Sequence, residues 1–240
     1  MKRLKINSDV GEGVFEEKSL MPYLNTCSIA CGGHYGDIET MNKTAKLAIA
    51  NKVLIGAHPS YPDKINFGRK DMFISSSSLK EALFNQISSL LMVLNNLGLN
   101  SLDHIKAHGA LYHKCFFDVE VANSYIDVVK LFKNVKILAP YGSVVSKIAE
   151  DNGVEVDYEV FLDRNYNNDL TLISRGEADS MIENSLEMSE RYKMVVNESK
   201  IKTFSNNLID IVGDTFCVHG DTKDSHLLLK SFYKNYFSYE

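Results

Sequence analysis

Short apolar runs alternate with longer amphipathic stretches along almost the whole chain, and this alternation constrains the fold more than any other feature. Seven runs have the character of buried strands: Leu4–Asn7, Cys27–Ala30, Val53–Ala57, His104–Lys106, Lys136–Ala139, Glu155–Val160 and Thr215–Val218. Six longer segments have helical patterns: Glu39–Ala50, Leu79–Leu97, Val119–Leu131, Gly142–Asp151, Asp179–Ser189 and Asp224–Tyr236. In the second of these, apolar residues recur at steps of three and four, which predicts one buried helix face.

Strands that alternate with helices form βα units and a mainly parallel sheet. In 240 residues, seven such units fit an α/β fold with one domain over residues 1–240. The periodicity alone does not separate a closed or nearly closed barrel from an open doubly wound sheet. Both architectures place their ligand sites in the loops that leave the carboxyl ends of the strands. Functional residues are therefore expected in those loops.

Histidine, glycine and acidic residues gather in these loops. Four of the seven histidines lie at predicted strand ends: His34, His58, His108 and His219. A single histidine at a strand end is usually structural, but four in equivalent positions converge on one mouth of a barrel or wound sheet. Imidazoles and carboxylates gathered there can act as general acids and bases or bind a cation. The other three histidines lack this placement.

A metal ion or a phosphate group is compatible with this set of residues. Asp9, His34, His58 and His108 form an Asp/His group suited to zinc or manganese, although their spacing is dispersed. Neither the Walker pattern nor G-x-G-x-x-G at the start of a helix occurs. Any phosphate would therefore be held by cationic side chains, for which the candidates are Lys106, Arg69 and Arg164.

The composition argues against several classes of partner. With 26 basic and 31 acidic residues, the net charge of −5 lacks the basic excess that nucleic-acid binding requires. The sequence contains no run of about 18 apolar residues, so no membrane span is expected. The N-terminus lacks the apolar stretch of a signal peptide. The four cysteines are widely spread, which predicts free, buried thiols in a reducing cytoplasm.

Six sequence blocks occur in a fixed order from residue 4 to about residue 222: N-S-D-V-G-E-G, C-S-I-A-C-G-G-H-Y-G-D, I-G-A-H-P-S-Y-P-D with N-F-G-R, H-I-K-A-H-G-A-L-Y, E-V-F-L-D-R and C-V-H-G-D. Together they resemble the LamB/YcsF family. One short block such as H-G-D would carry no weight, but six in order over nearly the whole chain are specific.

The resemblance implies a single-domain, seven-stranded (β/α) barrel related to the glycoside hydrolase/deacetylase barrels. It also implies ATP-dependent opening of the lactam of 5-oxo-L-proline to L-glutamate, with ATP hydrolysed to ADP and phosphate. Subunits B and C of a 5-oxoprolinase would be the partners. The residues on the family's polar motif positions are Asn7, Asp9, Glu12, His34, His58, Lys106, His108, Glu159, Asp163, Arg164, His219 and Asp221.

These residues, together with Arg69, divide into two expected groups. The catalytic group would be Asp9, Glu12, His58, Lys106, His108, His219 and Asp221. The group that binds substrate or phosphate would be Asn7, His34, Arg69, Glu159, Asp163 and Arg164. In this hypothesis Lys106 and Arg164 neutralise phosphate charge, and Asp9 or Glu12 serves as a base or holds a divalent metal. The histidines would transfer protons.

The chain departs from the family pattern in two blocks. Gly33 and Tyr35 stand where the family usually has Phe and Ala, and Ala107 stands where it usually has Pro. No polar group is lost, but a reshaped pocket wall would affect the identity of the substrate first. Two alternatives therefore stay open: a stand-alone metal-dependent deacylase or deacetylase, and a non-catalytic subunit that only binds substrate.

Overall fold

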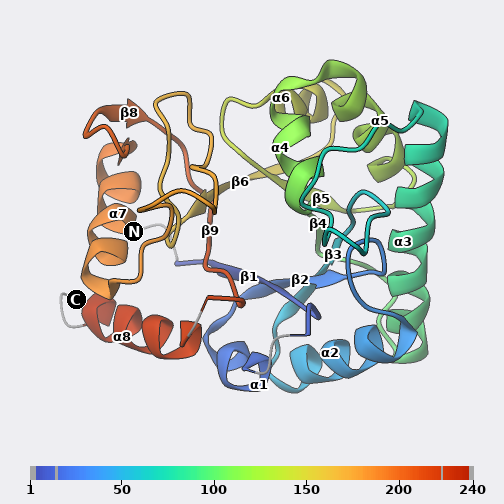
Figure 1. The fold of residues 1–240 in the computed structure, drawn as a ribbon. Coiled ribbons are helices and arrows are strands. Elements are labelled where there is room, and N and C mark those ends of the chain that lie inside the picture. Colours follow the sequence, from blue (N-terminus) through green and yellow to red (C-terminus); the bar gives the residue numbers. More distant parts are fainter. Residues whose placement is uncertain (1–3, 14–15, 223, 238–240) are drawn as a thin grey trace.

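The computed structural model describes residues 4–13, 16–222 and 224–237, and within them seven parallel strands close into a barrel (Figure 1). The strands pair in the order β1 (Ile6–Val10), β2 (Thr26–Ala30), β3 (Leu54–His58), β4 (His104–Ile105), β5 (Lys136–Ala139), β6 (Val156–Phe161) and β9 (Thr215–Cys217). β9 also pairs with β1 and completes the ring. The expected seven-stranded barrel is confirmed, and an open doubly wound sheet is excluded.

The first strand differs most from its prediction. It was expected over Leu4–Asn7, but β1 spans Ile6–Val10, and all five of its residues are buried. Ser8 and Asp9 are polar, so the apolar pattern ended before the strand did. As a result, Asp9 lies on the strand itself and not in the loop that follows.

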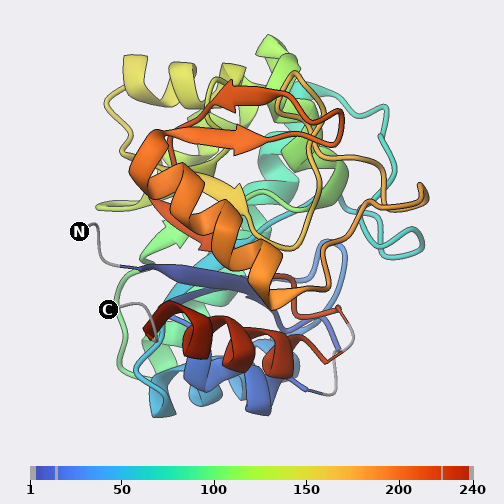
Figure 2. The same cartoon turned by 90° about the vertical axis from the view of Figure 1, so that its left-hand side faces the viewer.

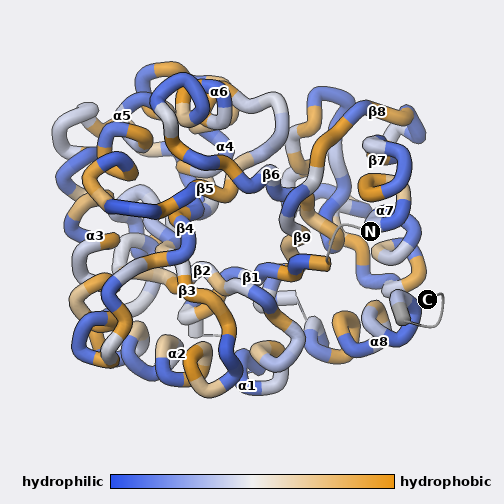
Figure 3. Tube along the Cα trace, turned by 180° about the vertical axis from the view of Figure 1, so that it is seen from behind, coloured by the Kyte–Doolittle hydropathy of each residue, from blue (hydrophilic) through white to orange (hydrophobic). Residues whose placement is uncertain are grey.

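Eight α-helices of the described residues surround the barrel: α1 (Glu17–Leu20), α2 (Ile38–Ala50), α3 (Ser76–Asn96), α4 (Gly109–Phe117), α5 (Val119–Val129), α6 (Val144–Asp151), α7 (Ser185–Glu198) and α8 (Ser225–Phe237). A short 3₁₀ turn, η1 (Met21–Tyr23), follows α1. The hydropathy trace alternates along the outer helices, as expected of helices with one face on the strands (Figure 3). In α3, the predicted face is buried at Leu79, Leu83, Ile87, Leu90 and Leu94.

Other parts of the fold also differ from the prediction, among them α1 and η1, which were not predicted. A helix was expected over Asp179–Ser189, but α7 begins later, at Ser185, and ends at Glu198. Asn184 caps α7 by accepting a hydrogen bond from the Leu186 amide. Helix α4 was missed, because the residues after His108 were assigned to a loop. The antiparallel hairpin of β7 (Lys200–Lys202) and β8 (Leu208–Asp210) was also missed, since strands of three residues carry little periodicity. The hairpin lies beside α7 (Figure 2).

His104, which begins β4, is a structural residue of the barrel. Its Nε2 lies 2.9 Å from the Ser28 hydroxyl, and its Nδ1 lies 3.0 Å from the Asp103 carboxylate. A Cβ added to Gly56 on β3 would come within 2.3 Å of the His104 ring. Glycine at this strand position therefore leaves the space that the buried imidazole fills.

No helix of the described residues combines the length and the apolar character needed to cross a membrane. All four cysteines are free and buried, as predicted. One of them, Cys217, lies 3.4 Å from the ammonium nitrogen of Lys106 and so belongs to the surroundings of the site described next.

Candidate active site at the mouth of the barrel

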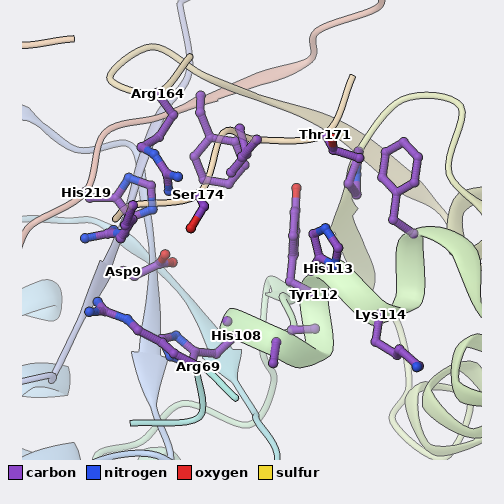
Figure 4. A pocket seen from close by; sticks show the side chains of 18 of the residues that line it. Asp9, Arg69, His108, Tyr112, His113, Lys114, Arg164, Thr171, Ser174 and His219 are labelled. Carbon is purple, nitrogen blue, oxygen red and sulfur yellow. The ribbon is translucent and has the colours of Figure 1, made fainter. Parts of the chain in front are cut away.

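A cavity of about 480 Å³ opens where the carboxyl ends of the strands meet. Nine of the thirteen predicted site residues line it: Asp9, Glu12, His58, Arg69, Lys106, His108, Glu159, Arg164 and His219. In Figure 4, Asp9, Arg69 and His108 lie toward one side of this cavity. Tyr112 and His113, both from α4, lie toward the other side. Most of the residues predicted at the strand ends therefore line one cavity.

Lys106 is a buried cation that lines the cavity, with 2% of its surface exposed. Its Nζ lies 2.8 Å from Glu159 Oε1 and 3.0 Å from Asp9 Oδ1. Burial alone would lower the pKa of Lys106, but the charges of Asp9 and Glu159 outweigh burial and hold this pKa well above its ordinary value. For the Asp9 carboxyl group, burial would raise the pKa, but the charges of His58 and Lys106 outweigh burial and lower it. The lysine is therefore protonated and Asp9 ionised at neutral pH.

Tyr112 is a site residue that the predicted set did not include. From α4, its hydroxyl donates a hydrogen bond of 2.9 Å to Glu159 Oε2, the carboxylate whose other oxygen contacts Lys106. Burial, followed by the charge of Glu159, raises the pKa of Tyr112 well above its ordinary value, so the phenol stays protonated. Its place in the H-G-A-L-Y block was the one available signal for this role.

A cluster of three histidines and one carboxylate lies beside Asp9. His34 Nε2 is 2.9 Å from Glu12 Oε1, and His108 Nδ1 is 3.0 Å from His58 Nε2. Each of these residues offers one ligand atom, and the four atoms lie within 4.8 Å of one another. Glu12 thus takes the place predicted for Asp9 in the candidate metal group. The reason is that the Asp9 carboxylate is held by Lys106, whereas Glu12 reaches the histidines from the loop after β1.

The protonation of this cluster follows from its burial. Burial lowers the pKa of His58 to about 3 and also lowers the pKa of His34. Burial works to raise the pKa of Glu12, but hydrogen bonds with His108 and His34 outweigh it and keep this pKa well below its ordinary value. At neutral pH, His34 and His58 are therefore uncharged and Glu12 is ionised.

Asp163 and His219 form a second unit of the site. The fully buried Asp163 carboxylate accepts a hydrogen bond of 2.7 Å from the His219 backbone amide, and it lies 3.0 Å from Nδ1 of the ring. The ring stacks on Phe161, with centroids 5.1 Å apart. Burial would raise the pKa of Asp163, but His219 lowers it. Since Asp163 engages Nδ1, Nε2 is the nitrogen left for a ligand, as in other Asp–His pairs.

Three arginines lie at the rim, with different roles. Arg69 and Arg175 both donate to Asp221 Oδ2, at 2.7 and 2.8 Å. Their remaining N–H groups are available for an anion. The buried Arg164 instead donates to the backbone carbonyls of Ile173 and Ser180, so its guanidinium secures the loop between β6 and α7. Arg175 was not predicted, because this loop carries no sequence pattern.

Four predicted residues do not line the cavity: Asn7, His34, Asp163 and Asp221. Asn7 donates to the Thr215 hydroxyl, which joins β1 to β9. Gly33 does not line the cavity either. A Cβ at Gly33 would lie 2.2 Å from Gln86 Oε1 and 2.4 Å from Ser60 Oγ, so this glycine allows close packing between loops. The expected change in the pocket wall is therefore not located at Gly33.

Comparison with known proteins agrees with this geometry. The LamB/YcsF family matches residues 4–237. The 5-oxoprolinase A subunit of Pyrococcus abyssi is 38% identical, covering 91% of this chain and 88% of its own. That of Haemophilus influenzae (strain PittEE) is 34% identical, covering 94% and 92%. The crystal structure of the lactam utilization protein from Thermus thermophilus superimposes with a TM-score of 0.90 at 28% identity, covering 99% and 97%. The chain belongs to the LamB/YcsF family.

Proposed function

We propose that this chain is the barrel subunit of an ATP-dependent 5-oxoprolinase, which opens the lactam of 5-oxo-L-proline to L-glutamate. ATP would be the co-substrate, and subunits B and C would be the partners. The relatives named above support the reaction class. The observation that carries the proposal is that one cavity is lined both by a buried ammonium, Lys106, and by His219, whose Nδ1 lies 3.0 Å from the Asp163 carboxylate.

The chemistry explains why ATP is needed. A five-membered lactam is a resonance-stabilised amide, and its amine stays tethered and ready to close the ring again. Phosphorylation of the lactam oxygen makes the ring carbon electrophilic. Water then adds to that carbon, the C–N bond breaks with a proton delivered to nitrogen, and an acyl phosphate results. A second water hydrolyses the acyl phosphate to glutamate and inorganic phosphate, so the overall reaction consumes one ATP and two waters.

The side chains of the cavity suit these steps. His219 Nε2 would accept the proton of the attacking water, and the imidazolium would return it to the ring nitrogen. Asp163 would fix the tautomer of that ring and stabilise its charged form. Lys106 would stabilise the negative charge that develops on the oxygen atoms of the reacting carbon. Arg69 and Arg175 would bind the substrate carboxylate or the phosphate at the rim.

Reconstituted turnover tests this proposal. Glutamate and ADP are measured from 5-oxo-L-proline and ATP, with the chain alone, with subunits B and C alone, and with all three. We expect equal amounts of the two products only from the complete mixture. Full turnover without this chain, or none with it, would overturn the proposal.

The cluster of histidines with Glu12 favours a second candidate, a stand-alone metal-dependent deacylase. The same assay separates the two, because such an enzyme would cleave an amide without ATP and without partner subunits. We place the reaction in a reducing cytoplasm, to which the four free, buried thiols are suited.

A further inference from the structure

Three residues of the histidine cluster line the cavity together: Glu12, His58 and His108. The atoms that lie close to one another are Glu12 Oε1, His58 Nε2 and His108 Nδ1. Their separations are 3.0 Å between the two nitrogens, 3.3 Å from Glu12 to His108 and 3.8 Å from Glu12 to His58. In a tetrahedral zinc site with bonds of roughly 2.0–2.1 Å, neighbouring ligand atoms lie about 3.3 Å apart. The three measured distances scatter around this value.

Two backbone carbonyls fix which nitrogens of these rings carry protons. His58 Nδ1 lies 2.9 Å from the Lys106 carbonyl, and His108 Nε2 lies 2.9 Å from the Phe67 carbonyl. A carbonyl only accepts, so both of these ring nitrogens are donors. The other two ring nitrogens, His58 Nε2 and His108 Nδ1, face each other at 3.0 Å. A divalent cation between these two nitrogens would be bound by both, and outer carbonyls of this kind orient the histidine ligands of metals.

His34 has a different geometry. Its ring stacks on His108 with centroids 3.6 Å apart and planes 4° apart. Two parallel stacked rings cannot both direct their in-plane lone pairs at one ion. His34 does not line the cavity, its Nε2 lies 2.9 Å from Glu12 Oε1, and its buried Nδ1 has no hydrogen-bond partner among the described residues. The geometry of His34 suits donation of a hydrogen bond from its Nε2 to the Glu12 carboxylate.

We propose that Glu12, His58 and His108 bind one zinc-type divalent metal ion whose fourth position faces the cavity, and that His34 positions Glu12. Two imidazoles and one carboxylate favour zinc or cobalt over magnesium or calcium. Three protein ligands with an open position are typical of catalytic zinc sites, whereas structural sites have four. Asp9, 3.5 Å from His58 Nε2, is not counted because Lys106 holds its carboxylate.

A bound ion of this kind would supply a Lewis acid or an acidic water at the cavity wall. Metal binding is measured on the chain without substrate, ATP or partner subunits, so this site does not depend on the proposed 5-oxoprolinase reaction. Failure of one proposal therefore leaves the other standing.

The test is a titration of the chelator-treated full chain with Zn²⁺, paired with the visible absorption spectrum of the Co²⁺ form. We expect one equivalent of zinc per chain, a tetrahedral cobalt spectrum, and no displacement by millimolar Mg²⁺. The variants His58→Gln, His108→Gln and Glu12→Gln should each bind zinc at least about 100-fold more weakly. His34→Gln should lose roughly 10- to 100-fold, the range for an outer residue that orients a ligand.

His113→Gln is the matched control, because this exposed histidine lines the same cavity outside the cluster. It should bind zinc as the unaltered chain does. Thermal melts of each variant identify any that fail to fold. The cobalt spectrum of the unaltered chain tests the metal site even if a variant does not fold. Absence of stoichiometric zinc, or equal loss in His113→Gln, would overturn the site. Loss in His34→Gln as large as in His58→Gln would overturn the three-ligand assignment in favour of four ligands.

Discussion

Replacement of Lys106 by methionine would remove the one cation that separates two buried carboxylates. Asp9 and Glu159 both contact Lys106 Nζ, at 3.0 and 2.8 Å, so their contacting oxygens are at most the sum of these distances apart, about 5.8 Å. With an effective dielectric constant of about 20, two like charges at that distance repel by roughly 3 kcal/mol. Removing one partner of a buried ion pair typically costs about 3–5 kcal/mol. We therefore expect Lys106→Met to lose about 3–5 kcal/mol of unfolding free energy at pH 7.

Urea unfolding followed by circular dichroism measures this loss, with chelator present so that metal binding does not contribute. Lys114→Met is the matched control, because Lys114 lines the same cavity but its ion pair with Asp71 is exposed. The control should unfold at the same urea concentration as the unaltered chain. The deficit of Lys106→Met should shrink at lower pH, as one of the unpaired carboxylates takes up a proton. A Lys106→Met chain as stable as Lys114→Met would refute the reasoning.

Three further predictions concern other parts of the chain. Asp163→Asn should leave the fold intact but lower kcat of the reconstituted complex by about 10²–10⁴, since the ring of His219 loses its orienting charge; unchanged kcat would count against the Asp–His pair. Gly56→Ala should cost about 1–3 kcal/mol in urea unfolding, because its Cβ overlaps the His104 ring; the cost should be smaller in a His104→Ala background. Burial would raise the pKa of Asp103, but His104 and Lys136 outweigh burial and lower this pKa. The ionised Asp103 therefore contributes its full stabilisation above the unfolded pKa of about 4, and this stabilisation is lost as the pH falls through the lower folded pKa. Unfolding curves of the unaltered chain and Asp103→Asn should therefore differ at pH 6 and converge at low pH.

The parallel βα arrangement was predictable because buried parallel strands consist of continuous apolar runs, and because helix α3 keeps one apolar face over Leu79–Leu94. Closure of the sheet into a barrel was implied only by the family resemblance. The four strand-end histidines were predictable for a related reason. Residues that follow the carboxyl ends of the strands gather at the mouth in this architecture, although His34 does not line the cavity. His58 at the end of β3 and His219 just after β9 both line the cavity as expected.

The partners of these residues were less predictable, because they depend on backbone paths that periodicity does not describe. Gly11 turns the chain after β1 with φ of +74°, and this turn precedes Glu12, which reaches the histidines while Asp9 stays with Lys106. Arg164 illustrates the same limit. Its sequence context suggested a phosphate ligand, whereas its guanidinium donates to carbonyls of a loop whose course no residue pattern reveals.

Glutamate formation by the reconstituted complex with a His219→Ala chain shows whether this barrel opens the lactam with His219 as its base. With 5-oxo-L-proline, ATP and subunits B and C present, we expect the variant to produce glutamate at least about 100-fold more slowly, the usual contribution of a general base. Glutamate formation at the rate of the unaltered chain would contradict the account.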